Sequence, residues 1–235
     1  MSFWDRTRRF ARARARARIG GLASRAVLFA CACACAVAAR AARNDVSAGL
    51  TSGRLKVRLD AAQAVIEHRG SASPDDLVAA SRRDANPEAR ARLLMAAYEV
   101  DIPRAIPALI AALRGDASPL VRSIAAQTLA RAGGSAGAPA RQAFHDGLAQ
   151  DAALAVRRKC AAALGFHHSP DAVKALAAAA SDPDPELRRG VGTALTLHPR
   201  SAETDRALDA LENDRDPSVA GRVRARRRAA RGPSK

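Results

Sequence analysis

Histidine and cysteine are the side chains in this chain best suited to binding a metal ion or carrying protons, and it has five histidines and four cysteines. His68, His167 and His198 each follow a recurring position of the chain by ten residues, so we expect them at equivalent helix ends, with His168 beside one of them. The helix dipole stabilises a cation at such an end without any ligand. No carboxylate or cysteine joins these histidines at metal-ligand spacing, and no HExxH motif or Gly-rich phosphate loop is present. We therefore predict no catalytic residue, no metal site and no cofactor.

Three of the cysteines belong to an apolar run over residues 26–39, where Cys31, Cys33 and Cys35 alternate with alanine. A cationic stretch precedes this run and small residues follow it, which is the order of a secretory signal. The run is short for a membrane span, which needs about 20 residues, although residues 19–24 would extend it. We predict an Arg/Ala-rich targeting or membrane segment over residues 1–45, with possible membrane contact through residues 19–39. The alternative is an extension with no targeting role.

The most regular polar residues are arginines and aspartates that recur along the chain. The recurring arginines, called anchors below, are Arg58, Arg90, Arg122, Arg157 and Arg188, and Ala220 takes the next anchor position. Successive anchors are 31 to 35 residues apart, and an aspartate stands six residues before each of the last five: Asp84, Asp116, Asp151, Asp182 and Asp214. The residues at −1, +3 and +7 from the anchors are mostly apolar, which is the stripe of a helix with one buried face. Cys160 is at +3, so we expect it to be buried.

Turn residues agree with helical repeats. Asn86, Ser118, Asp184 and Asp216 each precede a proline shortly before an anchor, which is typical of a helix N-cap followed by proline at the first helical position. A second apolar helical segment lies upstream of these starts, for example over residues 105–114. Aromatic residues make up 3% of the chain, so the core must consist of alanine, leucine and valine in closely packed helices. A period of this length indicates a stack of helical hairpins.

The repeated pattern D-x-x-P-x-V-R-x-x-A-A-x-x-L is nearly intact over residues 116–129 and recognisable over 151–164 and 182–195. It resembles the HEAT repeat, in the short form named after phycobilisome lyases. The resemblance covers roughly residues 46–223 and implies an all-α, right-handed α-solenoid of five to six HEAT-like helical hairpins of about 32 residues each. It also implies that aspartates and arginines of neighbouring units stack in a structural ladder. The predicted ladder contains Asp84, Arg90, Asp116, Arg122, Asp151, Arg157, Asp182 and Arg188.

The net charge of +16 is concentrated at the two ends of the chain. Residues 1–45 carry +8 and residues 222–235 carry +7, which leaves +1 between them. We predict that residues 224–235 form a basic C-terminal tail and that the last repeat is a frayed cap. In HEAT-like solenoids the second helix of each unit lines the concave face, and the positions at +1 and +2 from the anchors would point into it. The candidate partner-binding cations there are Arg92, Arg158, Lys159, Arg189 and Arg222.

These features favour a non-enzymatic scaffold that binds a protein partner, with an acidic partner suited to the cations, exported or tethered at the cell envelope. A cytoplasmic location is the alternative. A helical-repeat nucleic-acid binder is the first rival, but the array is nearly neutral and aromatic stacking platforms are scarce, so we expect no specific nucleic acid. An enzyme resembling a bilin lyase or a base-excision glycosylase is the second rival, and no constellation of polar residues supports it.

Overall fold

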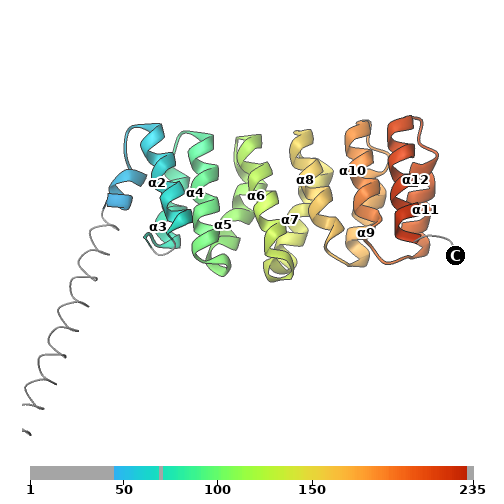
Figure 1. Ribbon diagram of the computed structural model, residues 1–235, viewed down its shortest axis with the longest axis horizontal. Coiled ribbons are helices and arrows are strands. Elements are labelled where there is room, and N and C mark those ends of the chain that lie inside the picture. The colour runs from blue at the N-terminus through green and yellow to red at the C-terminus, as the bar shows by residue number, and fades with distance from the viewer. Residues whose placement is uncertain (1–44, 69–70, 232–235) are drawn as a thin grey trace, which may run out of the picture.

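The computed structural model describes residues 45–68 and 71–231. Its helices alternate between two layers (Figure 1). The first layer contains α2 (Leu55–Glu67), α4 (Pro87–Val100), α6 (Pro119–Ala132), α8 (Leu154–Gly165), α10 (Pro185–Leu195) and α12 (Pro217–Arg231). The second layer contains α3 (Pro74–Arg83), α5 (Ile102–Gly115), α7 (Gly137–Gln150), α9 (Pro170–Ala179) and α11 (Ala202–Glu212). Successive helices within each layer contact one another, and each helix of the second layer contacts the first-layer helix that follows it, so the described chain is an all-α solenoid, as predicted.

Four helices, α4, α6, α10 and α12, begin directly after the predicted capping residues. The Oδ1 atom of Asn86 accepts hydrogen bonds from the backbone N–H groups of Glu88 and Ala89, at 2.9 and 3.2 Å, and Asp184 caps α10 in the same way. Asp216 accepts one from the Ser218 N–H at 2.8 Å. Ser118 occupies the N-cap position of α6 but its side chain makes no capping hydrogen bond. There the fixed φ of proline at the first helical position sets the start instead.

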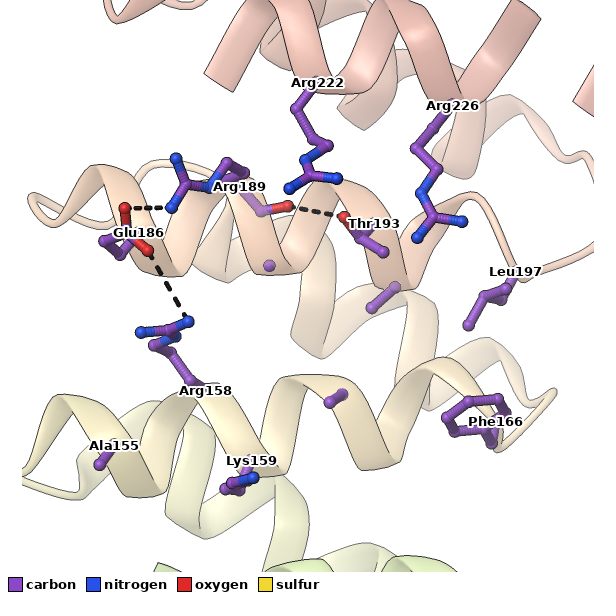
Figure 2. Close-up of a pocket in the computed structure, with 13 residues that line it drawn as sticks. Ala155, Arg158, Lys159, Phe166, Glu186, Arg189, Thr193, Leu197, Arg222 and Arg226 are labelled. Carbon is purple, nitrogen blue, oxygen red and sulfur yellow. Dashed lines mark hydrogen bonds and ion pairs between the residues drawn. The ribbon is translucent and has the colours of Figure 1, made fainter. Parts of the chain in front are cut away.

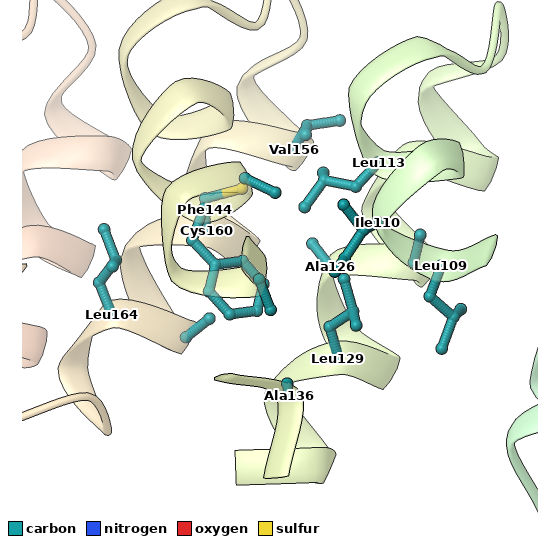
Figure 3. Close-up of a cluster of buried hydrophobic side chains, with 14 of the residues drawn as sticks. Leu109, Ile110, Leu113, Ala126, Leu129, Ala136, Phe144, Val156, Cys160 and Leu164 are labelled. Carbon is teal, nitrogen blue, oxygen red and sulfur yellow. The ribbon is translucent and has the colours of Figure 1, made fainter. Parts of the chain in front are cut away.

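The predicted apolar stripe forms the core. Val121, Cys160 and Leu129 are representative, because each is fully buried at its position of −1, +3 or +7 from an anchor. Figure 3 shows the central part of this core, where Phe144 and Cys160 lie among leucines of neighbouring helices. Val57 is the exception, since its position is buried in the other units but Val57 is 36% exposed. It lies in α2, the first long helix of the described chain, at the edge of the stack.

Small residues let successive units approach closely, as the composition suggested. A Cβ atom at Gly147 would lie 2.6 Å from the Cys160 Sγ, and one at Gly192 would lie 2.5 Å from the Val223 Cγ2. The longest anchor step is explained by a 3₁₀ turn, η1 (Gly133–Ala136), between α6 and α7. Gly133 begins this turn and Gly137 follows it, with φ angles of 55° and 70°, which an L-residue with a side chain adopts only with strain.

The C-terminal end differs from the prediction. The boundary that we placed after residue 223 falls inside α12, which continues to Arg231. Arg227 stands at +7 from the anchor position, where the other units have an apolar core residue, and its side chain is 11% exposed. Three acids of α11 pair with it: Asp209 at 2.6 Å, Glu212 at 3.1 Å and Asp205 at 3.6 Å. A charge at a core position is tolerated when it is paired in this way, so this part of the predicted tail packs against the array.

The predicted targeting segment over residues 1–45, with its apolar run and its three cysteines, lies almost entirely outside the described residues. Among the described residues, no helix combines the length and the apolar character that a membrane crossing requires.

Candidate functional site

The repeated aspartates and arginines connect neighbouring units. The Nε and Nη2 atoms of Arg122 donate to the two carboxylate oxygens of Asp151 in the next unit, at 2.7 and 2.8 Å, while Nη1 donates to the Asp116 carbonyl of its own unit at 2.8 Å. The pairs Arg58–Asp84, Arg90–Asp116 and Arg188–Asp214 have the same bidentate arrangement. The remaining pair, Arg157–Asp182, is looser, at 3.6 Å with no hydrogen bond between the side chains.

Four of these carboxylates have a pKa below the ordinary value, which favours the ionised state. Burial by itself would raise the pKa of Asp84, Asp116 and Asp151, but the hydrogen bonds from arginine and backbone and the nearby positive charges outweigh it and lower the pKa. The hydrogen bond from Arg188 lowers the pKa of Asp214. With the exception of the buried Arg157 Nε, which has no hydrogen-bond partner among the described residues, the polar atoms of the ladder are used within the array, which fits a structural role.

An open groove of about 750 Å³ crosses the first layer between α8, α10 and α12. The small residues Ala155, Ala162, Gly190 and Ala194 contribute to its lining. The lining residues of α8 and α10 share the positions −2, +1, +2, +5 and +9 from their anchors, so the groove follows one face of the repeat. The predicted binding face and this groove therefore coincide over the last three units.

Four of the five predicted cations lie together in this groove. They are Arg158 and Lys159 of α8, Arg189 of α10 and Arg222 of α12 (Figure 2). Arg92 lies outside it, on α4, where its Nη1 donates to the Gln63 Oε1 at 3.0 Å. The same position relative to the anchor therefore leads to different surroundings in different units.

Four charged or large apolar residues of the groove were not among the predicted site residues: Arg226, Glu186, Phe166 and Leu197. The sequence signal for Arg226 was its place one helical turn after Arg222, which puts both on one face of α12. Phe166 and Leu197 both stand nine residues after an anchor, and they are 67% and 39% exposed. That recurrence at +9 was the signal for an apolar end of the groove.

The groove carries more positive than negative charge, with five cations and one acid, Glu186. Glu186 forms an ion pair with Arg189, and its Oε2 lies 3.7 Å from the Arg158 Nη2. Among the described residues, no carboxylate lies within 4.0 Å of the charged groups of Lys159, Arg222 or Arg226. Like charges gathered without acidic partners favour an anionic ligand.

The histidines and Cys160 have local structural surroundings. His198 is buried and its Nε2 donates to the Leu164 carbonyl at 3.0 Å, while buried His167 packs against Phe144 with the rings tilted and their centroids 5.6 Å apart. Burial lowers the pKa of both histidines and raises the pKa of the Cys160 thiol to about 12. Within the described chain, no group of three or more His, Cys, Asp or Glu residues is arranged to hold a metal ion.

Comparison with known families agrees with the fold. The family model for HEAT repeats matches residues 73–146 and 141–230, which together make up more than half of the chain. The chain therefore belongs to the HEAT-repeat family. No curated protein matches the sequence significantly.

Several solved structures are similar to the chain. One comes from work on microtubule plus-end tracking by XMAP215, CLIP-170 and EB1, with 15% identity, coverage of 79% of this chain and 90% of that chain, and a TM-score of 0.48. Human deoxyhypusine hydroxylase in complex with glycerol has 16% identity, coverage of 84% and 99%, and a TM-score of 0.47. The CpcE–CpcF complex of phycocyanin lyase from a Nostoc species has 19% identity, coverage of 80% and 98%, and a TM-score of 0.39. At this level of similarity none of their activities transfers to this chain.

Proposed function

We propose that this protein is a non-enzymatic HEAT-repeat scaffold that binds an acidic segment of a partner protein in the groove between α8, α10 and α12. The observation that carries the proposal is the gathering of five cations around a single acid, with Lys159, Arg222 and Arg226 lacking a carboxylate within 4.0 Å among the described residues. An acidic segment would supply the missing negative charge, and complementary charge sets both the rate and the specificity of such encounters.

The apolar part of the groove favours a polypeptide over a nucleic acid. Phe166 and Leu197 are exposed at one end, and alanines and a glycine lie between the cations. Amino-acid side chains fill such apolar surface, whereas single-stranded nucleic acids are usually bound on several stacked aromatic rings. Phe166 is the one aromatic residue in the lining of this groove.

Binding rather than catalysis also fits the state of the ionisable groups. The ladder carboxylates are bound to arginine, and the thiol of Cys160 is buried with a pKa of about 12, so it is protonated at neutral pH. A nucleophilic cysteine needs a lowered pKa, which is the opposite shift.

The proposal includes export or tethering at the cell envelope. It is supported by the order of cationic, apolar and small residues in the first 40 positions. Cell fractionation with amino-terminal sequencing of the full-length protein tests it. Cleavage near Ala38 or recovery with membranes would support it, and an intact amino terminus in the cytoplasmic fraction would favour the cytoplasmic alternative.

Fluorescence anisotropy with a labelled peptide, Gly-Glu-Glu-Leu-Phe-Glu-Glu-Gly, tests the binding role with the full-length chain. We expect the double variant Arg222→Gln/Arg226→Gln to weaken binding about tenfold, since each arginine loses one charged contact. The matched control is Arg82→Gln/Arg83→Gln, because both arginines are exposed on α3 in the other layer and the net charge changes equally. Its affinity should stay within about twofold of wild type.

The same measurements separate the rival functions. Equal affinities for both double variants would refute binding in the groove. A labelled single-stranded oligonucleotide provides the opposing test. If it binds at submicromolar concentration with steep salt dependence, and if Arg222→Gln/Arg226→Gln abolishes that binding, the ligand of the groove is a nucleic acid and not an acidic protein segment.

A further inference from the structure

We infer, resting on the proposed function, that the groove recognises a segment in which a bulky apolar side chain stands beside acidic residues, and that Glu186 determines which arginines those acids bind. The groove would then have three parts: an apolar end, a pair of arginines that Glu186 already binds, and a pair of arginines available to the partner.

Glu186 bridges two helices of the groove. It projects from the first turn of α10, pairs with Arg189 one turn further along, and reaches across to Arg158 on α8 at 3.7 Å (Figure 2). Its carboxylate therefore occupies the position that a partner carboxylate would take between these two arginines. A partner acid would have to displace Glu186, which exchanges one ion pair for another and gains little affinity.

Arg222 and Arg226 are in a different situation. They lie one turn apart on α12, and both guanidinium groups extend from α12 toward α10 (Figure 2). No carboxylate of the described chain lies within 4.0 Å of either one, so a partner acid forms new ion pairs here without displacing any. The planar guanidinium groups suit bidentate contacts to carboxylates.

The apolar end lies next to this pair. Phe166 and Leu197, which follow α8 and α10, stand together at the end of the groove nearest Arg226 (Figure 2). They are among the exposed large apolar side chains of the described chain. Burying a bulky side chain against them is worth about 25 cal/mol for each Å² of apolar surface removed from water. The juxtaposition therefore selects a segment in which an apolar residue neighbours the acids.

The position of Glu186 in the repeat makes its role specific to the groove. The corresponding position, two residues before the anchor, holds Ala155 in α8 and Ser218 in α12, which cannot neutralise a cation. In α4 it holds Glu88, which is exposed and lies outside the groove. Glu88 is therefore a matched control, because replacing it by glutamine makes the same chemical change at the same repeat position.

The test uses the full-length chain and two labelled peptides of equal charge, the one above and a version with Leu-Phe replaced by Ala-Ala. We expect the Leu-Phe peptide to bind wild type at least about fivefold more tightly. Glu186→Gln should tighten binding of both peptides by about threefold to tenfold and increase its salt dependence, because Arg158 and Arg189 become available. Glu88→Gln should stay within about twofold of wild type.

A final comparison uses two double variants of equal charge. Relative to wild type, Arg222→Gln/Arg226→Gln should weaken peptide binding about tenfold. Arg158→Gln/Arg189→Gln should weaken it no more than about threefold. Equal losses for the two pairs, an unchanged affinity in Glu186→Gln, or equal binding of both peptides would overturn the inference while leaving an acidic ligand in the groove. Insensitivity to both arginine pairs would instead refute the proposed function itself.

Discussion

The ladder predicts a graded response to one substitution made at two equivalent positions. Asp151 and Asp182 are both six residues before an anchor, and the Oδ1 of each accepts a backbone hydrogen bond at 2.9 Å, from Ala153 and from Asp184. They differ in their arginine. Asp151 receives two short hydrogen bonds from Arg122, whereas Asp182 lies 3.6 Å from Arg157 without one. Replacement by asparagine keeps the size and the capping oxygen and removes the charge.

The magnitude follows from these distances and from exposure. The side chains of Arg122 and Asp151 are 15% and 7% exposed, so solvent screens this pair weakly. Asp151→Asn removes one of two charge-assisted hydrogen bonds and the negative charge, which should lower the free energy of unfolding by about 2 kcal/mol. This is less than the full loss of a buried ion pair, because Arg122 keeps its hydrogen bonds to backbone carbonyls. Asp182→Asn should cost below about 1 kcal/mol, since no side-chain hydrogen bond is lost.

Thermal unfolding followed by helical circular dichroism measures the difference. For an array of this size, about 2 kcal/mol corresponds to a fall in Tm of about 4–8 °C for Asp151→Asn, and Asp182→Asn should lower it by less than about 4 °C. Equal losses for the two variants would show that capping or general charge, rather than the bidentate pair, stabilises the ladder. No loss for Asp151→Asn would refute the ladder as a source of stability.

Two further predictions concern the C-terminal cap and the buried histidines. Deleting residues 224–235 should lower Tm by about 3–6 °C, because the Arg227 ion pairs and the end of α12 are lost. Arg227→Met in the full-length chain should lower Tm by less than the deletion does, because the methionine side chain still fills the core position. An unchanged Tm after the deletion would show that the last repeat is a frayed cap, as the sequence predicted. Burial lowers the pKa of His167 and His198 below the ordinary value of about 6.5, so as pH falls the unfolded chain binds protons first. Their contribution to stability is complete above about pH 6.5 and is lost progressively as pH falls toward the lowered folded-state pKa. Tm should therefore be lower at pH 5.5 than at pH 7.5. A His167→Phe/His198→Gln variant should show a smaller difference in Tm between these two pH values. If the Tm of that variant depends on pH as strongly as the Tm of wild type, other titratable groups cause the effect.

The fold was predictable because its signals are local and repeated. Proline after a capping residue fixes where a helix starts, as at Asn86 and Asp184, and the spacing of apolar residues fixes which face is buried. The recurrence of this pattern in successive units is what a stacked array requires, and Leu129 and Leu164 are buried accordingly. Val57 fits the same pattern and is exposed, because burial also depends on what covers a residue.

The candidate site was predictable only in part, because a groove depends on the distances between helices. Arg92 and Lys159 occupy the same position relative to their anchors, yet Lys159 lines the groove and Arg92 binds Gln63 on the neighbouring helix. The pairing of Glu186 with Arg158 depends on the separation of α8 and α10, which no local pattern specifies.

The sequence by itself determined the repeat, its register, its buried stripe and the face on which cations gather, since each depends on residues within one or two helical turns. The tertiary structure decided which charges meet. Arg227 carries the same charge as the exposed Arg228 beside it, but its place at a core position against three acids of α11 makes it part of the array. Arg222 and Arg226 face a groove whose one acid, Glu186, pairs with Arg158 and Arg189, so they are available to a partner. Coulomb interactions fall off with distance and depend on burial, so identical side chains take opposite roles once packing has set their neighbours.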